Sequence, residues 1–460
     1  MTLIKSISGI RGTIGGPIGD NLTPIDLVKF TAAYSCWLQG EFPGQKLTVV
    51  VGRDARISGK MAQKIVMGTL MGCGVDVVNI DMATTPTVEV AVTHFAANGG
   101  IILTASHNPK QWNALKLLGP AGEFLSAAQG AKVLQIAATD SYTFVDVDAL
   151  GKVIFSGEFN REHIDMVLAL PLVDIEAVKA KKFKVVVDAV NSIGGKVIPE
   201  LLRRMGVEVV ELNCTPNGEF PHNPEPLPEH LTEIAAKVVA EKADLGVVVD
   251  PDVDRLALVC GDGSMFGEEY TLVAVADYIL SKTGGNTVSN LSSSRALNDV
   301  TVRHGGVYTA AAVGEVNVVA KMKEVHATIG GEGNGGVIYP ELHYGRDALV
   351  GVALFLTYLA HTGMTAKALR GVYPEYYMSK NKIQLSPSTN VDDILLKMKA
   401  KYASEKVTDI DGVKIDFPSE WIHLRKSNTE PIIRIYSESG TQAMADALAT
   451  RIMDEIRAII

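Results

Sequence analysis

The stretch Lys184–Leu212, with the sequence KVVVDAVNSIGGKVIPELLRRMGVEVVEL, decides the fold. It opens with a run of valines, passes a Gly-Gly turn and a helical pattern over Lys196–Met205, and closes with a second valine-rich run at Glu208–Leu212. Short β-branched runs predict buried strands, and glycines mark the turns between strand and helix. A strand, a helix and a second strand form a βαβ unit, which requires a right-handed crossover and implies parallel strands covered by helices.

The same order of elements occurs more than a hundred residues earlier. A β-branched strand at Leu47–Val51 leads through a loop into a helical pattern at Lys60–Met71, and a second strand follows at Gly74–Ile80. We interpret this as an internal duplication. Further strands of the same kind are predicted at Asp244–Val249 and Thr287–Leu291, so the chain is expected to contain several similar α/β domains with mixed or parallel sheets.

The last ninety or so residues have a different pattern. A strand begins in Tyr373–Ser379, a helix follows at Val391–Tyr402, Asp411-Gly412 marks a hairpin, and a helix at Gln442–Ile459 ends the chain. Alternating strands joined by a tight turn predict an antiparallel sheet. This part is therefore expected to be a smaller α+β domain.

Composition narrows the function classes. The chain has 460 residues, which exceeds what one core usually sustains, and its 47% hydrophobic content with 43 glycines fits an α/β protein. The net charge of −9 argues against nucleic acid or an anionic membrane as partner, because both are bound through excess Lys and Arg. The four cysteines are widely separated and form no CxxC motif, so they indicate neither a zinc site nor a disulfide framework. Because disulfides are rare in reducing compartments, we expect a cytoplasmic location.

A serine follows a predicted buried strand in Thr104-Ala105-Ser106-His107-Asn108-Pro109. Between the strand end and a proline that cannot continue helix or ladder, the hydroxyl can be exposed and held in one orientation. A lone Ser-His pair is more often an ordinary turn. The second motif, Asp250-Pro251-Asp252-Val253-Asp254-Arg255, changes that balance, because three converging carboxylates are unstable without a cation.

The aspartate loop predicts a metal site. Its oxygen ligands come from the end of the apolar run Leu245–Val249, and a hard cation that keeps positions for substrate oxygens, first of all Mg²⁺, suits them. A structural calcium site is the alternative, but the loop lacks the glycine and distal glutamate of an EF-hand.

Two later loops suit a phosphorylated sugar. The glycine-rich stretch 330–336 presents Glu332 and Asn334, a mixture of acceptor and donor groups that suits hydroxyls, and no Lys or Ser/Thr follows in the P-loop arrangement. The stretch Arg425–Pro431, with Arg434 just beyond it, concentrates cations and hydroxyls suited to a phosphate dianion. Two arginines in the loop 52–59 offer another place for an anion, unless they pair with the aspartate between them.

These four stretches resemble, in sequence order and over essentially the whole chain, the signature loops of the α-D-phosphohexomutases: TASHNP, DxDxDR, GEx(S/N)G and RxSNTEP. The resemblance implies three similar α/β domains and a smaller C-terminal α+β domain around a central cleft. The expected divisions are 1–150 with the phosphoserine loop, 151–255 with the metal loop, 256–368 with the sugar loop and 369–460 with the phosphate loop.

The resemblance also implies roles for individual residues. Ser106 would be phosphorylated and would share Mg²⁺ with Asp250, Asp252 and Asp254. Lys116 would be a general acid/base, and His107 and Arg255 would be the other catalytic residues. Arg11 and Arg53 would be arginines that line the cleft. The other substrate-binding residues are expected to be Glu315, Glu332, Asn334, Arg425, Ser427, Asn428, Thr429 and Arg434.

The implied activity is that of an isomerase, an intramolecular phosphotransferase. It would interconvert hexose 6-phosphate and hexose 1-phosphate through a bisphosphorylated intermediate. The protein is expected to be a monomer or a homodimer. The ending Asn334-Gly335-Gly336 and the acidic Glu315 resemble the glucosamine enzymes, since a carboxylate can pair with a substrate ammonium. Mannose or glucose phosphate is the alternative substrate, and a metal-dependent sugar phosphatase is the alternative reaction.

Overall fold

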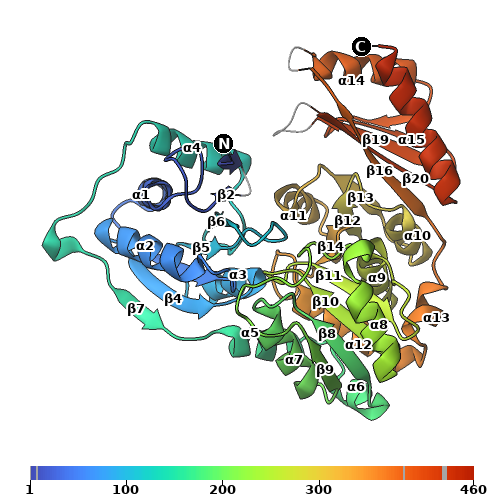
Figure 1. Ribbon diagram of the computed structural model, residues 1–460, viewed down its shortest axis with the longest axis horizontal. Coiled ribbons are helices and arrows are strands. Elements are labelled where there is room, and N and C mark those ends of the chain that lie inside the picture. The colour runs from blue at the N-terminus through green and yellow to red at the C-terminus, as the bar shows by residue number, and fades with distance from the viewer. Residues whose placement is uncertain (1, 7–8, 387–388, 427–431, 460) are drawn as a thin grey trace. The chain divides into compact units, whose positions relative to one another are not determined.

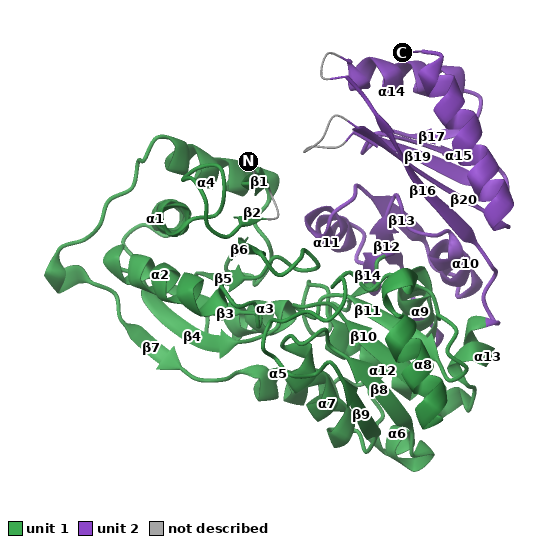
Figure 2. Ribbon diagram, viewed as in Figure 1, with its two compact units in different colours: residues 1–278, 334–370 green, residues 279–333, 371–460 purple. Residues whose placement is uncertain are grey.

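The computed structural model describes residues 2–6, 9–386, 389–426 and 432–459 (Figure 1). They form two compact units, shown in Figure 2: residues 1–278 with 334–370, and residues 279–333 with 371–460. We describe each unit by itself. Among the described residues, no helix has the length and apolar character needed to cross a membrane.

The first unit begins with a seven-stranded mixed sheet of order β1-β2-β6-β5-β3-β4-β7. Strands β5, β3, β4 and β7 are parallel, whereas β6 runs antiparallel to both β5 and β2. In β3, Val49 and Val51 belong to the core that contains α1, α2 and α4 residues, and Val50 belongs to the core that contains α3 residues. Both faces of the sheet are therefore covered. The elements are β1 (Ile4–Ser6), β2 (Gly9–Thr13), α1 (Pro24–Glu41), β3 (Thr48–Arg53), α2 (Gly59–Gly72), β4 (Asp76–Met82), α3 (Thr85–His94), β5 (Gly99–Leu103), β6 (Trp112–Leu118), α4 (Ala127–Ala138), η1 (Val147–Ala149) and β7 (Val153–Ser156).

A second sheet in the same unit has the order β11-β10-β8-β9. Strands β10, β8 and β9 are parallel, and β11 returns antiparallel to β10. The β10–β11 connection is therefore a hairpin, and it carries the aspartate motif. The elements are α5 (Asn160–Leu168), α6 (Ile175–Lys181), β8 (Lys184–Asp188), α7 (Gly194–Arg204), β9 (Glu208–Leu212), η2 (Pro228–His230), α8 (Thr232–Glu241), β10 (Leu245–Val249), β11 (Leu256–Cys260), α9 (Glu268–Thr283, which ends in the second unit), β15 (Gly336–Ile338), α12 (Ala348–Thr362) and α13 (Ala366–Arg370).

The second unit contains two different folds. Strands β13, β12 and β14 are parallel neighbours in that order, whereas the C-terminal sheet β16-β20-β19-β18-β17 is antiparallel. Side chains of α14 and α15 share one core with the C-terminal strands. The elements are β12 (Thr287–Asn290), α10 (Ala296–Arg303), β13 (Tyr308–Ala311), α11 (Glu315–Glu324), β14 (Ile329–Glu332), β16 (Tyr377–Gln384), α14 (Val391–Lys401), β17 (Lys406–Thr408), β18 (Val413–Asp416), β19 (Trp421–Lys426), β20 (Ile432–Ser439) and α15 (Gln442–Arg457).

The predicted fold class is confirmed, and so is the duplication: β3-α2-β4 and β8-α7-β9 are both parallel βαβ units. The antiparallel C-terminal sheet and its hairpin are confirmed as well. The sequence patterns did not single out β6, which follows the serine loop directly and runs back along β5. This strand matters for the site because it carries Lys116.

Candidate active site

The serine loop leaves the sheet at the end of β5 and is held by a buried framework. Ser106 has a left-handed backbone, with φ of 48°, and its amide donates to Thr104 Oγ1 at 3.0 Å. Thr104 donates in turn to Asp54 Oδ2 at 2.7 Å. The fully buried guanidinium of Arg56 pairs with the same carboxylate at 3.0 Å and donates to the carbonyls of Ser106 and Asn108 at 2.5 and 2.6 Å. This network fixes the position of the serine before any ligand is present.

The two arginines of the loop 52–59 have partners inside the protein. Arg56 pairs with Asp54, as the alternative interpretation of this loop proposed, and clamps the serine loop as well. Arg53 is 2% exposed; its guanidinium donates to Gln63 at 3.2 Å and pairs with Asp81 at 2.9 Å. The substrate role of Arg53 stays a prediction, and it would require a donor now used by Asp81.

The aspartate motif forms the tight turn between β10 and β11. Val253 at its centre has φ of 64°, and its amide donates to the carbonyl of Asp250 at 3.1 Å. The turn brings one carboxylate oxygen from each of Asp250, Asp252 and Asp254 within 4.8 Å of one another, with all three residues fully buried. Within the part of the chain that the structure describes, the Oδ1 atoms of Asp252 and Asp254 have no hydrogen-bond partner. Buried carboxylate oxygens without partners are the donor set that a hard cation needs.

Two cations and one hydroxyl from distant elements bind two of the aspartates. Lys116 Nζ lies 2.7 Å from Asp252 and 3.6 Å from Asp254, and Arg346 donates to Asp254 at 2.7 Å. Thr85, the first residue of α3, donates to Asp252 Oδ2 at 2.6 Å. Burial opposes ionisation of Asp252, but the Lys116 cation outweighs burial and lowers the pKa of Asp252. Burial likewise opposes the charged form of Lys116, yet the two aspartates raise the pKa of that lysine.

Asp250 is the aspartate that contacts the serine. Ser106 Oγ donates to Asp250 Oδ2 at 2.9 Å, and the backbone amide of Arg255 donates to Asp250 Oδ1 at 3.2 Å. Burial, followed by repulsion from Asp254 and Asp252, raises the pKa of Asp250 well above its ordinary value. The structure therefore brings the candidate nucleophile and the candidate metal loop into direct contact.

The serine hydroxyl has a second neighbour in His107, whose Nδ1 lies 3.4 Å away. Burial, together with the positive charges of Arg255 and Arg11, lowers the pKa of His107 to about 2, so the imidazole is neutral near pH 7. Arg255 pairs with Glu225 at 3.4 Å. Arg11, on β2, pairs in register with Ala114 of the neighbouring β6. The charges of Arg255 and Arg11 thus act on His107, and the catalytic and substrate roles of these three residues stay predictions.

The end of the glycine-rich loop lies next to the metal loop. The amide of Leu256, the residue after Arg255, donates to the carbonyl of Gly335 at 3.1 Å. Gly335 has φ of 84°, and a Cβ there would lie 2.2 Å from the carbonyl oxygen of Leu256, so this approach requires glycine. Asn334 accepts a hydrogen bond from the Gly336 amide at 3.2 Å. Its carboxamide oxygen is thus held by the backbone of its own loop.

In the second unit, Glu332 and Glu315 lie at the ends of neighbouring elements. Glu332 ends β14, and its Oε1 accepts from Asn290 at 2.9 Å and from the Gly314 amide at 3.2 Å. Glu315 begins α11 directly after Gly314. Both glutamates are buried. The hydrogen bond to Gly314 thus links the predicted sugar loop to the start of α11.

The C-terminal sheet aligns three cations. Strand register pairs Arg425 with Arg434, and Arg434 with Lys382 of β16. Residues directly opposite in antiparallel strands point to the same face, where like charges repel unless an anion lies between them. Arg425 is also bound by Asp411 at 2.9 Å. Three further predicted substrate-binding residues, Ser427, Asn428 and Thr429, lie outside the described residues.

Comparison with known proteins identifies the family. Four consecutive models match: phosphoglucomutase/phosphomannomutase α/β/α domain I over residues 3–143, domain II over 161–263, domain III over 267–376 and the C-terminal domain over 386–455. The chain belongs to the phosphoglucomutase/phosphomannomutase family. The resemblance to the α-D-phosphohexomutases is therefore confirmed.

Relatives of this family cover nearly the whole chain. A phosphoglucomutase/phosphomannomutase of Thermococcus kodakarensis is 34% identical over 94% of this chain and 95% of its own length. A phosphoglucosamine/phosphogalactosamine mutase of Sulfurisphaera tokodaii is 32% identical over 96% of this chain and 97% of its own. The crystal structure of a phosphoglucomutase/phosphomannomutase family protein from Burkholderia thailandensis has a TM-score of 0.84 at 26% identity, covering 100% of this chain and 97% of that one.

Sequence reasoning missed several residues that hold this family's motifs in place here. Thr85 carries a detectable signal, since Thr84 caps α3 and Pro86 follows within its first turn. Arg346 precedes Asp347, the N-cap of α12, which is a helix-start signal. Neither signal points to the aspartate loop, because the contact joins elements that are far apart along the chain. Lys382 is found only from the strand register.

Proposed function

We propose that this protein is a phosphohexose mutase, which interconverts hexose 6-phosphate and hexose 1-phosphate through a phosphoserine at Ser106 and a bisphosphorylated sugar. One observation carries the proposal: Ser106 Oγ lies 2.9 Å from Asp250, in a loop whose carboxylates have buried oxygens without partners among the described residues. A phosphoryl group on that oxygen would face the cation that these carboxylates require. Family membership supports the same reaction.

The first half-reaction exchanges a phosphoryl group for a proton. The bond between phosphorus and Ser106 Oγ breaks, a bond forms between phosphorus and a hydroxyl oxygen of the hexose monophosphate, and the hydroxyl proton replaces the phosphoryl group on the serine. The second half-reaction runs the same exchange backwards with the other phosphate of the bisphosphate. Such a transfer needs in-line positioning and neutralised oxygens more than covalent chemistry from the protein.

We assign Lys116 the proton transfer in both directions. In the structure its ammonium is held by Asp252 and Asp254, which raise its pKa and keep it protonated, so the lysine can give up its proton only when their negative charge is offset. A divalent cation such as Mg²⁺ on the three aspartates would supply charge for the transferring oxygens and offset the negative charge that keeps the lysine protonated. Neutral His107 and the Arg255 cation flank the serine loop.

The remaining predicted residues receive substrate-binding roles. Glu332 and Asn334 supply the acceptor and donor groups suited to sugar hydroxyls. Arg425, Arg434 and Lys382, aligned across three strands, suit the phosphate that is not reacting, together with Ser427, Asn428 and Thr429. The expected division into four domains around one cleft, at 1–150, 151–255, 256–368 and 369–460, belongs to the same proposal.

We favour glucosamine phosphate as the substrate. Glu315 is a carboxylate at the start of α11, linked through Gly314 to Glu332, and a carboxylate can pair with a substrate ammonium. The relative from Sulfurisphaera tokodaii bears a hexosamine-phosphate mutase name, whereas that from Thermococcus kodakarensis bears a glucose and mannose name. Comparing kcat/KM on glucosamine 1-phosphate, mannose 1-phosphate and glucose 1-phosphate, in wild type and Glu315→Gln, tests the choice. Equal losses on all three substrates would reject the ammonium pair.

The nucleophile is tested with Ser106→Ala. Intact-protein mass spectrometry of wild type incubated with hexose bisphosphate is expected to show a phosphate-sized increment that maps to Ser106, and the alanine variant should lose both the increment and turnover. Ser156→Ala, an exposed serine on β7, is the control. A fully active Ser106→Ala variant would reject the proposal. Release of inorganic phosphate instead of the isomeric sugar phosphate in a single turnover would indicate the phosphatase.

A further inference from the structure

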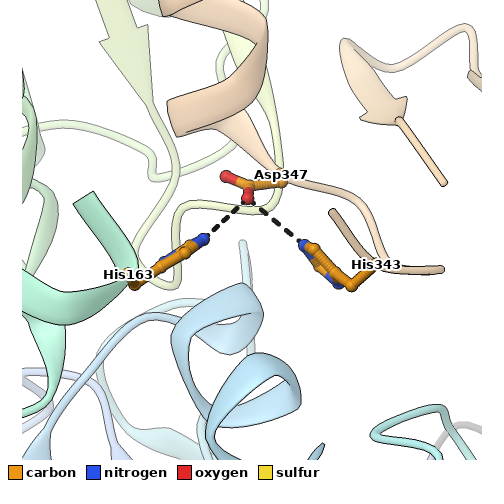
Figure 3. Close-up of side chains that lie close together, drawn as sticks. All are labelled: His163, His343 and Asp347. Carbon is orange, nitrogen blue, oxygen red and sulfur yellow. Dashed lines mark hydrogen bonds and ion pairs between the residues drawn. The ribbon is translucent and has the colours of Figure 1, made fainter. Parts of the chain in front are cut away.

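A second group of metal-ligating side chains lies outside the site described above. His163 of α5, His343 and Asp347, the N-cap of α12, converge on one point (Figure 3). The Nε2 atoms of His163 and His343 lie 3.0 and 3.2 Å from the same oxygen, Asp347 Oδ2. We propose that His163, His343 and Asp347 bind a divalent transition-metal ion of the Zn²⁺ class. This inference does not depend on the proposed mutase activity.

The distance of each histidine nitrogen from the shared carboxylate oxygen fits such an ion. Zinc lies about 2.0–2.1 Å from imidazole nitrogen and carboxylate oxygen, so two ligands of a tetrahedral site lie about 3.3 Å apart. The observed separations of 3.0 and 3.2 Å are close to that value. Two imidazoles with one carboxylate favour zinc-like metals over Mg²⁺ or Ca²⁺, which prefer oxygen ligands. Three protein ligands leave a fourth position for water.

The outer faces of all three ligands are braced. His343 Nδ1 lies 3.2 Å from the buried carboxylate of Glu89, and His163 Nδ1 lies 2.9 Å from Thr87 Oγ1. Asp347 Oδ1 accepts from the amides of the first turn of α12, at 2.8 and 3.3 Å. In the structure both Nε2 atoms donate to Asp347 Oδ2, and an ion would take the place of these protons, with the remaining imidazole protons on Nδ1. A histidine that donates its other N–H to a carboxylate or hydroxyl is the usual support of a metal ligand.

The cluster contains two buried carboxylates, Glu89 and Asp347. Glu89, Asp347 and His163 are at most 1% exposed, and the His343 side chain is 10% exposed. Burial opposes the charged form of His343, but Glu89 and Asp347 lie on either side of it and raise the pKa of its imidazole to about 10, so a divalent ion would have to displace a proton from His343 to bind there. Buried charges are costly unless they are paired or bind a metal. His343 is the partly exposed member of the cluster.

An ion here would tie together the elements that hold the aspartate loop. Thr87 and Glu89 lie on α3, whose first residue, Thr85, binds Asp252. Asp347 directly follows Arg346, which binds Asp254. We therefore assign the ion a structural role beside the catalytic site.

Zinc titration of the full-length protein tests the proposal. The protein is stripped with a chelator and saturated with Mg²⁺ to fill the aspartate loop, and Zn²⁺ is then added in a calorimeter. One equivalent of Zn²⁺ is expected to bind and to raise the melting temperature. His343→Gln should weaken Zn²⁺ by about 100-fold or more, and Glu89→Gln, which keeps the shape of the brace, by about 10-fold to 100-fold. His361→Gln, which breaks an exposed His–Asp pair of 2.9 Å, should bind Zn²⁺ like wild type.

Cobalt provides a second readout. Co²⁺ in place of Zn²⁺ should give wild type the visible absorption of a tetrahedral nitrogen and oxygen site, and His343→Gln should lack it. The proposal is overturned if wild type binds no Zn²⁺ in the presence of Mg²⁺. It is also overturned if folded His343→Gln and Glu89→Gln variants bind Zn²⁺ as tightly as wild type, since the four side chains would then be an ion-pair network only.

Discussion

Replacing Lys116 with methionine should change metal binding and turnover in opposite directions. The lysine side chain is 11% exposed and its Nζ lies 2.7 Å from Asp252 and 3.6 Å from Asp254, so it occupies the negative field that a metal ion also seeks. Methionine keeps most of the apolar stem and removes the charge. The variant therefore separates two possible tasks of Lys116, proton transfer and the balancing of the aspartates.

The effect on metal binding follows from Coulomb's law. Two unit charges about 4 Å apart interact by about 1 kcal/mol in bulk water and about 4 kcal/mol at the effective dielectric near a protein surface. Removing the lysine removes at least this repulsion from a bound divalent ion. Lys116→Met should therefore bind Mg²⁺ at least about fivefold more tightly than wild type, since 1.4 kcal/mol corresponds to a factor of ten.

The effect on turnover has the other sign. Loss of a general acid/base typically costs about 10²-fold to 10⁴-fold, so kcat at saturating Mg²⁺ should fall by that factor, with little change in KM. If Lys116 only balanced the aspartates, the bound ion would take over this task and kcat would change little. The two tasks thus predict clearly different rates at saturating metal.

Calorimetric titration with Mg²⁺ and a coupled mutase assay at saturating Mg²⁺ measure the two quantities. Lys110→Met is the matched control, because Lys110 lies near the serine loop but forms an exposed ion pair with Glu219 at 2.6 Å. A Lys116→Met variant whose kcat stays within about tenfold of wild type would refute the proton-transfer role. Weaker Mg²⁺ binding in that variant would refute the electrostatic reasoning.

Three further predictions concern the aspartate loop and the C-terminal sheet. Thr85→Val removes a charge-assisted hydrogen bond of 2.6 Å to Asp252 and should lower kcat/KM about 10-fold to 100-fold. Thr93→Val, on the same helix, is the control and should leave kcat/KM unchanged. An unchanged kcat/KM in Thr85→Val would contradict a role of this hydrogen bond in the site. Lys382→Met should raise KM for hexose phosphate by about tenfold without changing Ser106 phosphorylation, and Lys399→Met, which loses only an exposed pair, should leave KM unchanged. Because the pKa of Asp250 is raised, its proton must leave before Mg²⁺ binds, so Mg²⁺ affinity should rise with pH; a flat calorimetric profile would contradict this.

The fold could be predicted because its signals are local. Valine runs separated by glycine turns specify β3, β4, β8 and β9, and the hairpin at Asp411-Gly412 specifies the C-terminal sheet. The three aspartates could be predicted as one cluster because they lie in a single short turn. In each of these cases, the residues that define the feature are neighbours along the chain.

The supporting contacts could not be predicted because they join distant parts of the chain. Thr85 and Asp252 are 167 residues apart, and Arg346 and Asp254 are 92 residues apart. The cluster of His163, His343 and Asp347 forms no sequence motif. His163 lies 180 residues before His343 and 184 residues before Asp347, and Asp347 on its own indicates only the start of a helix. Such pairs become visible only when the sheets place α3, α5 and α12 beside one another.

The distribution of countercharge within the aspartate loop explains where a metal ion should act. Asp252 is paired with Lys116 and Asp254 with Arg346, whereas Asp250 has the Ser106 hydroxyl and a backbone amide as its partners. The pKa of Asp250 is accordingly raised by burial and by its two neighbours. Asp250 is therefore the carboxyl group of the loop without a salt bridge to a side chain of the described residues, and it is the one nearest to the reacting oxygen. A cation that displaces the proton of Asp250 would lie where a phosphoryl group on Ser106 most needs neutralisation, so the pairing of the other two aspartates directs the ion toward the chemistry.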